Sequence, residues 1–349
     1  MSDSLSKSWN EESVADFFNV EVPAKLGPQR ASAVTPQTCT QLAKQVLKTE
    51  DLQLVDFQGA ASFTLISHDA GKIFQVRRSI LDDGLLALAA KVYQSLTPSM
   101  LRLTECNDFP LPVYIADIVA GTHMIHLLPT PPDLPTPEDR FYQTAIDLAR
   151  FHAKALQFPQ ETCQTNGWTS NAQVLLDGLL KDPVLARLAP ELLPVITESR
   201  THLHLLDTLP PVLTHADLGV VNLFADEQTG ALTGVIDWDH ATIERFGMTI
   251  WSLYENFLSC RSKEGIVFYE QPLRSKLENA FWGELRSSTA EVLDSTTSGP
   301  AVRAAAVAGA ITRYLDLETL EDETEDHEFY LQRAKGFLPA MPKVIESDL

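Results

Sequence analysis

Cysteine is scarce in this chain, and no two cysteines form a local pair. The four cysteines lie far apart among 349 residues, and none belongs to a Cys-x-x-Cys motif. This spacing excludes the common zinc-binding and disulfide-framework patterns. A chain without a disulfide framework suits a reducing compartment, so we expect a cytoplasmic protein.

Long apolar runs and internal repeats are also missing. The segment Met1–Asn10 is polar and lacks the apolar core of a signal peptide. No apolar run approaches the ~18 residues that span a bilayer. No segment recurs at a fixed period, which excludes solenoids and propellers. We therefore expect a globular protein that does not cross a membrane.

Positive charge is in deficit. Lys and Arg number 27 against 47 Asp and Glu, which gives a net charge of −20. Nucleic-acid binding requires cations that neutralise phosphates, and an acidic membrane surface repels such a chain. The acidic balance either serves solubility alone or attracts a cationic small molecule. We expect a small-molecule partner, with neither nucleic acid nor a membrane.

The first part of the chain has the pattern of a small antiparallel sheet. Apolar residues make up 44% of the chain, and its length suffices for two cores. Turns separate four strand-like segments, at 54–57, 62–67, 72–77 and 111–118. A helical pattern covers 80–96, and residues 11–50 are typical of helices interrupted by prolines. One sheet with one helix is the simplest assembly of these pieces.

A proline-rich segment, 129–137, follows and predicts a boundary between two lobes. Beyond it the pattern is mainly helical, over 137–156, 171–206, 249–262, 270–292 and 300–317. Two short apolar segments flank a turn at 226–230. We expect an α+β, two-lobed fold with a small antiparallel-sheet N-lobe and a large, mainly helical C-lobe. The predicted divisions are a helical extension (1–50), a sheet lobe (51–128) and a helical lobe (129–349).

The sequence Thr-His-Ala-Asp-Leu-Gly-Val-Val-Asn carries the strongest chemical signal. A strand leads into a His-x-Asp loop at Asp217, Asn222 follows five residues later, and Ile-Asp-Trp-Asp places Asp237 fifteen residues further on. Phosphoryl transfer explains these residue types. One carboxylate orients the attacking hydroxyl, while an amide oxygen and a second carboxylate bind Mg²⁺ against the phosphates.

These motifs resemble those of the aminoglycoside phosphotransferase and choline kinase family. The resemblance covers roughly Val55 to Leu338, and the segment from Arg245 to Trp251 is similar to a branch abundant in fungi, where secondary metabolism is a typical setting. It implies a protein-kinase-like fold and ATP- and Mg²⁺-dependent phosphorylation of a hydroxyl, or an amine, of a small molecule. Asp217 would be catalytic, and Asn222 and Asp237 would bind the metal.

The resemblance also places the ATP-binding residues. Gly59 and Ser62 correspond to the phosphate-covering loop, and Arg77 to the strand cation that faces the phosphates. Ile115 and Asp117 correspond to the segment that binds adenine through its backbone. Three features depart from the family pattern: the loop holds a single glycine, Arg replaces Lys, and the helix 80–96 offers no Glu to pair with that Arg.

Several alternatives stay open at this point. The same fold can host other chemistry, such as cyclisation or rearrangement of a metabolite, or act as a non-catalytic binding module. His215 is expected to support the loop rather than act as a base, and Asp239 to assist a second metal or the substrate. The acidic run 318–328 is either a solvated face or an attractor of cations.

Overall fold

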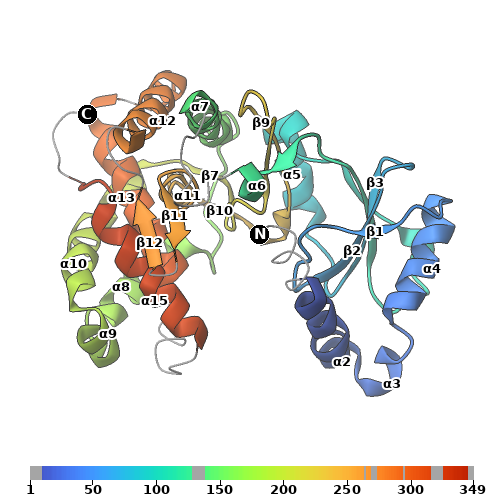
Figure 1. Cartoon of the computed structure of the whole chain (residues 1–349). Coiled ribbons are helices and arrows are strands. Elements are labelled where there is room, and N and C mark those ends of the chain that lie inside the picture. The colour runs from blue at the N-terminus through green and yellow to red at the C-terminus, as the bar shows by residue number, and fades with distance from the viewer. Residues whose placement is uncertain are drawn as a thin grey trace. The chain divides into compact units, whose positions relative to one another are not determined.

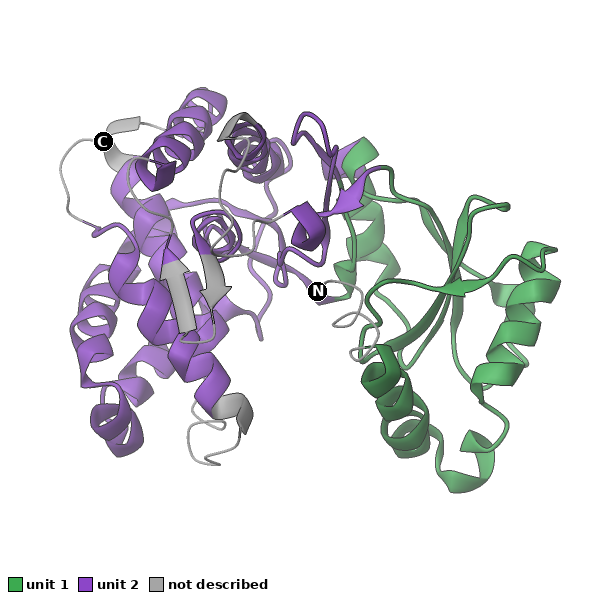
Figure 2. Cartoon of the chain, viewed as in Figure 1, with its two compact units in different colours: residues 1–90, 95–120, 234–239 green, residues 91–94, 121–233, 240–349 purple. Residues whose placement is uncertain are grey.

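The computed structural model describes residues 10–127, 138–262, 265–268, 273–293, 295–315 and 325–344. The chain divides into two compact units, coloured separately in Figure 2. Unit 1 comprises residues 1–90, 95–120 and 234–239, and unit 2 comprises 91–94, 121–233 and 240–349. The short segment 234–239, which contains Asp237, thus belongs with unit 1 although it lies far along the chain.

Unit 1 is built on a five-stranded antiparallel sheet in the order β1-β2-β3-β5-β4 (Figure 1). The strands are β1 (Gln53–Leu54), β2 (Ser62–Ser67), β3 (Lys72–Arg77), β4 (Met100–Arg102) and β5 (Val113–Asp117). The predictions for 62–67 and 72–77 are confirmed, because both segments alternate between a buried apolar face and a polar face. Strand β4 was not predicted.

The predicted strand 54–57 is wrong beyond Leu54. The side chain of Asn10 donates to Val55 O at 2.8 Å and accepts from Gln58 N at 2.9 Å. The Gln58 amide in turn exchanges two hydrogen bonds with the backbone of Thr64. Side chains therefore satisfy backbone groups that a longer strand would have paired, and the segment forms bends instead.

The helix predicted over 80–96 begins later than its apolar pattern suggests. Helix α5 covers Asp83–Tyr93, and a 3₁₀ turn covers Gln94–Leu96. The Asp82 carboxylate accepts from the N–H groups of Gly84 and Leu85 at 2.9 and 3.0 Å. Asp82 thus caps the first turn, which fixes where the helix starts.

Short N-terminal helices cover one face of the sheet. They are a π-helical turn (Phe17–Glu21), α2 (Val22–Leu26), α3 (Pro28–Ala31) and α4 (Pro36–Leu47). Thr35 and Thr38 form a capping box in front of α4, and Pro36 takes its first position. The prolines that divide the predicted helical region 11–50 therefore begin new helices.

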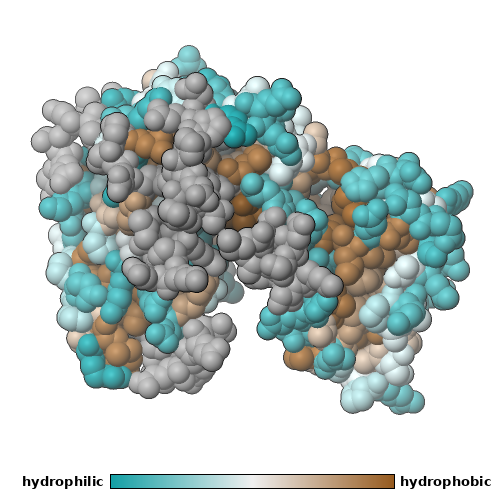
Figure 3. Space-filling model, viewed as in Figure 1, coloured by the Kyte–Doolittle hydropathy of each residue, from teal (hydrophilic) through white to brown (hydrophobic). Residues whose placement is uncertain are grey.

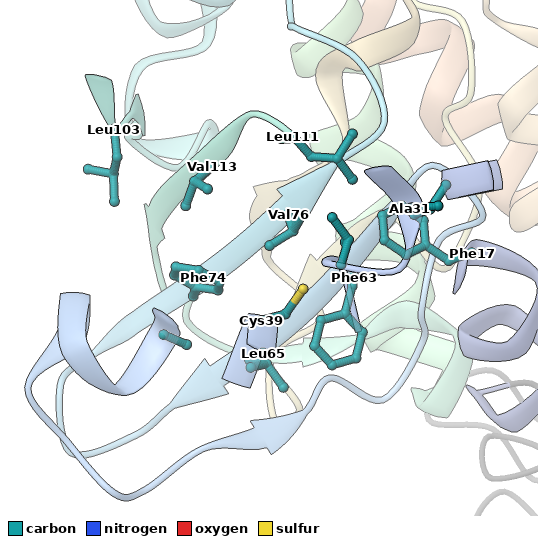
Figure 4. Packing of buried hydrophobic residues seen from close by; sticks show 13 residues of the cluster. Phe17, Ala31, Cys39, Phe63, Leu65, Phe74, Val76, Leu103, Leu111 and Val113 are labelled. Atoms are coloured by element: carbon teal, nitrogen blue, oxygen red, sulfur yellow. The ribbon is translucent and has the colours of Figure 1, made fainter. Parts of the chain in front are cut away.

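The core of unit 1 lies between these helices and the sheet. Figure 4 shows Phe63, Leu65, Phe74 and Val76 directed from the strands to the side where Cys39 of α4 lies. All five side chains are at most 4% exposed. In Figure 3 hydrophobic residues are visible over the strands between α2 and α4. The opposite face of β2 and β3 carries Ile66 and Ile73 at one end and polar side chains from Thr64 and Gln75 to Ser62 and Arg77.

Unit 2 is mainly helical. Its α-helices are α6 (Met124–Leu127), α7 (Glu138–Ala155), α8 (Trp168–Leu179), α9 (Pro183–Leu188), α10 (Leu193–His202), α11 (Trp251–Asn256), α12 (Leu273–Thr289), α13 (Ser295–Tyr314) and α15 (Glu325–Phe337). Its 3₁₀ turns cover Pro190–Leu192, Leu203–Thr208 and Leu338–Ala340. Helix α7 packs against α12, and the alanines of α13 are buried.

Short strands interrupt these helices. Strand β7 (Pro211–His215) pairs with β10 (Ala241–Arg245), and β8 (Leu223–Ala225) lies between β6 (Thr122–His123) and β9 (Leu232–Val235). The strand pair flanking the turn 226–230 was predicted. The helix predicted over 249–262 is wrong beyond Asn256, because Phe257 leaves the helical conformation and β11 (Ser259–Ser262) pairs with β12 (Gly265–Phe268).

Some predictions fall outside the described residues. The proline-rich segment 129–137 and most of the acidic run 318–328 are among them, so the predicted lobe boundary at residue 129 stays a prediction. Within the part of the chain that the structure describes, no helix combines the length and the apolar character needed to cross a membrane.

Candidate active site

The loop after β7 is held by hydrogen bonds to five successive carbonyl groups. Asp217 O accepts from Gly219 N and from the Asn222 side chain, at 2.9 and 2.8 Å. Gly219 O accepts from Asn222 N at 2.9 Å. Asn256 Nδ2 donates to Leu218 O at 2.6 Å. Ile125 N donates to Val220 O at 3.3 Å, and His123 Nδ1 donates to Val221 O at 2.9 Å. The backbone that carries Asp217 and Asn222 is therefore fixed by its surroundings.

Side chains from α11 and β6 provide part of this support. Asn256 is buried at the end of α11, and its bond to Leu218 O joins that helix to the loop. The bond from His123 requires the tautomer with a proton on Nδ1, because a carbonyl oxygen only accepts. His215, at the end of β7, is 1% exposed.

The Asp217 carboxylate lies between an arginine and an amide. Arg313 Nη2 is 2.5 Å from Asp217 Oδ1, and Asn222 Nδ2 is 3.4 Å from Oδ2. The guanidinium of Arg313 also lies over the Trp251 ring, 5.4 Å from its centroid. Asp217 stays one-third exposed, so an ionised carboxylate is presented to solvent with its orientation set.

Helix α13 places Arg313 beside the loop. Gly309 lies one turn before Arg313, and a Cβ atom added there would meet Met248 O at 1.7 Å. The backbone of α13 thus approaches residue 248 as closely as a glycine allows. The run of alanines before it is buried as well, with Ala305 and Ala306 fully so. A helix with larger side chains at these positions would hold Arg313 further away.

Asn222 has the orientation that a cation ligand needs. Its Nδ2 donates to the Asp217 carbonyl, which leaves Oδ1 as the acceptor end of the amide. Among the described residues no cluster of three His, Cys, Asp or Glu side chains forms a complete metal cage. Mg²⁺ is typically held by one or two protein oxygens together with substrate phosphates and water. The Asn222 amide oxygen fits as one of these protein ligands.

Asp237, in unit 1, has an unusual backbone conformation. It follows the end of β9, and its φ of +65° lies in the left-handed region. Its side chain is 34% exposed. Trp238 is buried beside it and donates its indole N–H to Val235 O at 3.0 Å. A non-glycine residue in this region marks a conformation that the surrounding structure imposes, often at a functional site.

Arg77 is buried on the polar side of β3. Its side chain is 4% exposed, and Nη2 donates to Asp239 Oδ2 at 2.5 Å. Nη1 donates to Gln75 Oε1 at 3.3 Å and lies 3.7 Å from Asp237 Oδ1. The neighbouring Arg78 is exposed and pairs with Glu21. Side chains alternate along a strand, so β3 directs Arg77 inward and Arg78 to the solvent.

The polar face of β2 and β3 continues from Arg77. Gln75 Nε2 donates to Thr64 Oγ1 at 3.2 Å, and the hydroxyl groups of Ser62 and Thr64 are 3.1 Å apart. Ser62 is opposite Arg77 in the strand register, and it is buried. Gly59 lies in the exposed turn before β2. The predicted phosphate-loop residues thus lead directly into the strand pair that carries Arg77.

Ile115 and Asp117 lie on β5, between β3 and β4. Strand β5 is paired along both edges at Ile115, which is opposite Phe74 of β3 and Leu101 of β4. The Asp117 N–H donates to Ser99 O at 3.1 Å. The Lys72 ammonium bonds the Asp117 carboxylate and lowers its pKa. These backbone groups are already used within the sheet, so their assignment to adenine stays a prediction.

Sequence reasoning missed Arg313, Asn256 and His123. Arg313 lies 96 residues after Asp217, and Asn256 lies 38 residues after Leu218. No local spacing marks such pairs. His152 is a buried core residue, and desolvation lowers its pKa from 6.5 to about 3.

Two solved structures are similar to this chain. One is an aminoglycoside 2'-phosphotransferase IIIa variant in complex with GDP, with a TM-score of 0.55 and 17% identity over 85% of this chain and 94% of that chain. The other, from Ralstonia eutropha, is described as a candidate aminoglycoside phosphotransferase, with a TM-score of 0.53 and 12% identity over 86% of this chain and 96% of that one. At these identities they show a shared fold.

The sequence profile of the phosphotransferase enzyme family matches residues 82–274. None of the curated protein sequences matches this chain. The matched region is more than half of the chain and contains the loop at Asp217 and the segment at Asp237. Together with the protein-kinase-like α+β fold, the match shows that the chain belongs to the phosphotransferase enzyme family and is an enzyme of its small-molecule kinase type.

Proposed function

We propose that this protein transfers a phosphoryl group from ATP, with Mg²⁺, to a hydroxyl or amine of a small molecule. Asp217 orients the acceptor and takes its proton, and Asn222 and Asp237 bind Mg²⁺. Arg77 neutralises phosphate charge, and Gly59 and Ser62 line the phosphate-covering loop. These assignments rest on the family motifs and on the geometry of each unit taken by itself.

The rigid loop at Asp217 is the observation that carries the proposal. Each of five successive carbonyls has a hydrogen-bond donor, so Asp217 and Asn222 keep their positions without a ligand. Phosphoryl transfer depends on positioning more than on covalent help from the protein. A non-catalytic binding module has no need to hold an ionised carboxylate, one-third exposed, in one orientation.

The residues of this chain would then act in sequence. Asp217 would accept a hydrogen bond from the acceptor hydroxyl and direct the hydroxyl lone pair to the γ-phosphorus of ATP. It would receive the proton as the new O–P bond forms and the bond from that phosphorus to the leaving ADP oxygen breaks. Arg77 donates to phosphate oxygens. When bound, Mg²⁺ supplies further neutralisation of phosphate charge. Asn222 contributes its Oδ1 and Asp237 its carboxylate to that ion.

The nucleotide base needs its own test. The similar aminoglycoside phosphotransferase structure is a GDP complex, and the backbone N–H of Asp117 is occupied within the sheet. Calorimetric titrations should therefore include GTP beside ATP, each with and without Mg²⁺. We expect a purine nucleotide to bind and Mg²⁺ to strengthen that binding. Saturation at a hundredfold excess over Kd should stabilise the fold by ~2.7 kcal/mol.

Two substitutions test the roles of the carboxylates. Asp237→Ala should abolish the Mg²⁺-dependent part of nucleotide binding. Asp217→Asn should keep nucleotide affinity and lower turnover by ~10²–10⁴. Turnover is followed by phosphorus NMR over a panel of small alcohols, amines and hydroxy acids. A wild-type protein that binds no nucleotide at millimolar concentration would overturn the proposal and favour a cleft used for other chemistry.

A further inference from the structure

The helix that supplies a Glu to the strand cation in the family pattern contains no Glu here. Within α5 the acidic residue is Asp83, in the first turn, and the rest of the helix is Leu, Ala, Val, Gly and Tyr with one Lys. Arg77 is nevertheless 4% exposed. A buried guanidinium without a counter-charge would be strongly destabilising, so its partner must come from elsewhere in the fold.

Asp239 is that partner. Its Oδ2 lies 2.5 Å from Arg77 Nη2, although the two residues are 162 positions apart in the sequence. Asp239 is 14% exposed and lies in the 3₁₀ turn Trp238–His240 that follows Asp237. Asp237 Oδ1 is more distant from the guanidinium, at 3.7 Å, and more exposed, at 34%. Asp239 thus forms a direct hydrogen bond with the Arg77 guanidinium, whereas Asp237 lies at the longer distance of an ion pair.

The rest of the environment fixes the plane of the guanidinium. Gln75 Oε1 accepts from Nη1 at 3.3 Å, and Gln75 is itself bonded to Thr64. Asp239 and Gln75 take two of the five N–H donors of Arg77, so others remain for a phosphate. A guanidinium held in one plane loses little freedom on binding a planar pair of phosphate oxygens, and this raises affinity.

We propose that Asp239 is the positioning residue for Arg77, replacing the absent helix carboxylate. It acts through Arg77 on the nucleotide phosphates and is not a ligand of Mg²⁺. This inference rests on the proposed function, because it assumes that Arg77 meets the phosphates of a nucleotide. It predicts that loss of the Asp239 charge weakens nucleotide binding even when no metal is present.

The test is calorimetry of ATP in EDTA with the wild-type chain, Asp239→Asn, Arg77→Met and the double variant. Asparagine keeps the shape and an acceptor for Nη2, so the fold should persist. We expect Asp239→Asn to raise the metal-free Kd roughly tenfold, the effect of a charged hydrogen bond. The double variant should match Arg77→Met within about twofold, because both residues act through one guanidinium.

Asp69→Asn is the matched control. Asp69 is exposed in the turn between β2 and β3 and has the same charge as Asp239. It should leave the metal-free Kd unchanged. If Asp239→Asn does not fold, Asp239→Glu replaces it, because a side chain longer by one carbon–carbon bond (~1.5 Å) displaces the guanidinium and should also weaken metal-free ATP binding.

Two results would overturn the inference while leaving the proposed function intact. If Asp239→Asn weakens only Mg²⁺-dependent binding, Asp239 is a metal ligand. If it tightens metal-free ATP binding, Asp239 competes with the phosphates for Arg77. Failure of the wild-type chain to bind ATP or GTP is a different outcome, which overturns the proposed function and this inference with it.

Discussion

Arg313 Nη2 lies 2.5 Å from Asp217 Oδ1, an ion pair that joins α13 to the loop after β7. The pair is partly exposed, at 25% and 33% of the two side chains. It therefore contributes modestly to stability, since solvent screens it. Its larger effect is on orientation, because the guanidinium and the Asn222 amide hold the two oxygens of the same carboxylate.

We expect Arg313→Leu to lower turnover roughly tenfold to a hundredfold while ATP-Mg²⁺ affinity changes little. The reason is that Arg313 contacts the Asp217 carboxylate and the Trp251 ring, and neither residue is assigned to nucleotide binding. Steady-state phosphorylation and calorimetry measure the two quantities separately. Arg200→Leu is the control, since Arg200 forms a similar pair with Asp177 away from the loop. Equal losses in both variants would contradict the orienting role.

Gly309→Ala should destabilise unit 2. Its Cβ would meet Met248 O at 1.7 Å, so α13 must move away from residue 248, at a cost of about 1–3 kcal/mol. Gly283→Ala on α12 is the matched control, because nothing lies within 4 Å of the added atom. That change should stabilise by about 0.5–1 kcal/mol through helix propensity. Urea denaturation of both variants checks the opposite signs.

Asp237→Gly should leave the fold more stable than Asp237→Ala. Both variants lose the carboxylate, so their difference isolates the backbone at φ +65°. Alanine carries a Cβ that disfavours this conformation by about 1–2 kcal/mol, whereas glycine adopts it freely. Paired melting curves measure the difference. If Ala and Gly are equally stable, the left-handed conformation is absent from the protein in solution.

His152 should make stability depend on pH between about 3 and 6.5. Burial lowers its folded-state pKa to about 3. Between this pH and 6.5 the imidazole is protonated in the unfolded chain and neutral in the folded chain. Stability is therefore lost as pH falls below 6.5, by up to about 1.4 kcal/mol per pH unit. Replacing His152 by Gln, which does not titrate, should flatten this slope. His204→Gln, on an exposed residue, is the control, and an unchanged slope for His152→Gln would contradict the assignment.

Local chemistry allowed much of this protein to be predicted from its sequence. Strands β2 and β3 were predictable because apolar and polar side chains alternate along them. The loop from His215 to Asn222 was recognisable because the residue types that phosphoryl transfer uses lie only a few positions apart. Element ends were less predictable. Strand β1 ends at Leu54 because Asn10, far earlier in the chain, binds the backbone of Val55 and Gln58.

The sequence by itself determined the family and marked the short loop from His215 to Asn222 as its candidate catalytic segment. Only the tertiary structure decided which side chains pair with Asp217 and with Arg77. A single Arg on α13 or a second Asp after Asp237 has the same local pattern whether it is solvated or paired. Arg313 meets Asp217 across 96 residues, and Asp239 meets Arg77 across 162. Such pairs form because each buried or half-buried charge needs a counter-charge, and packing determines which one comes within reach.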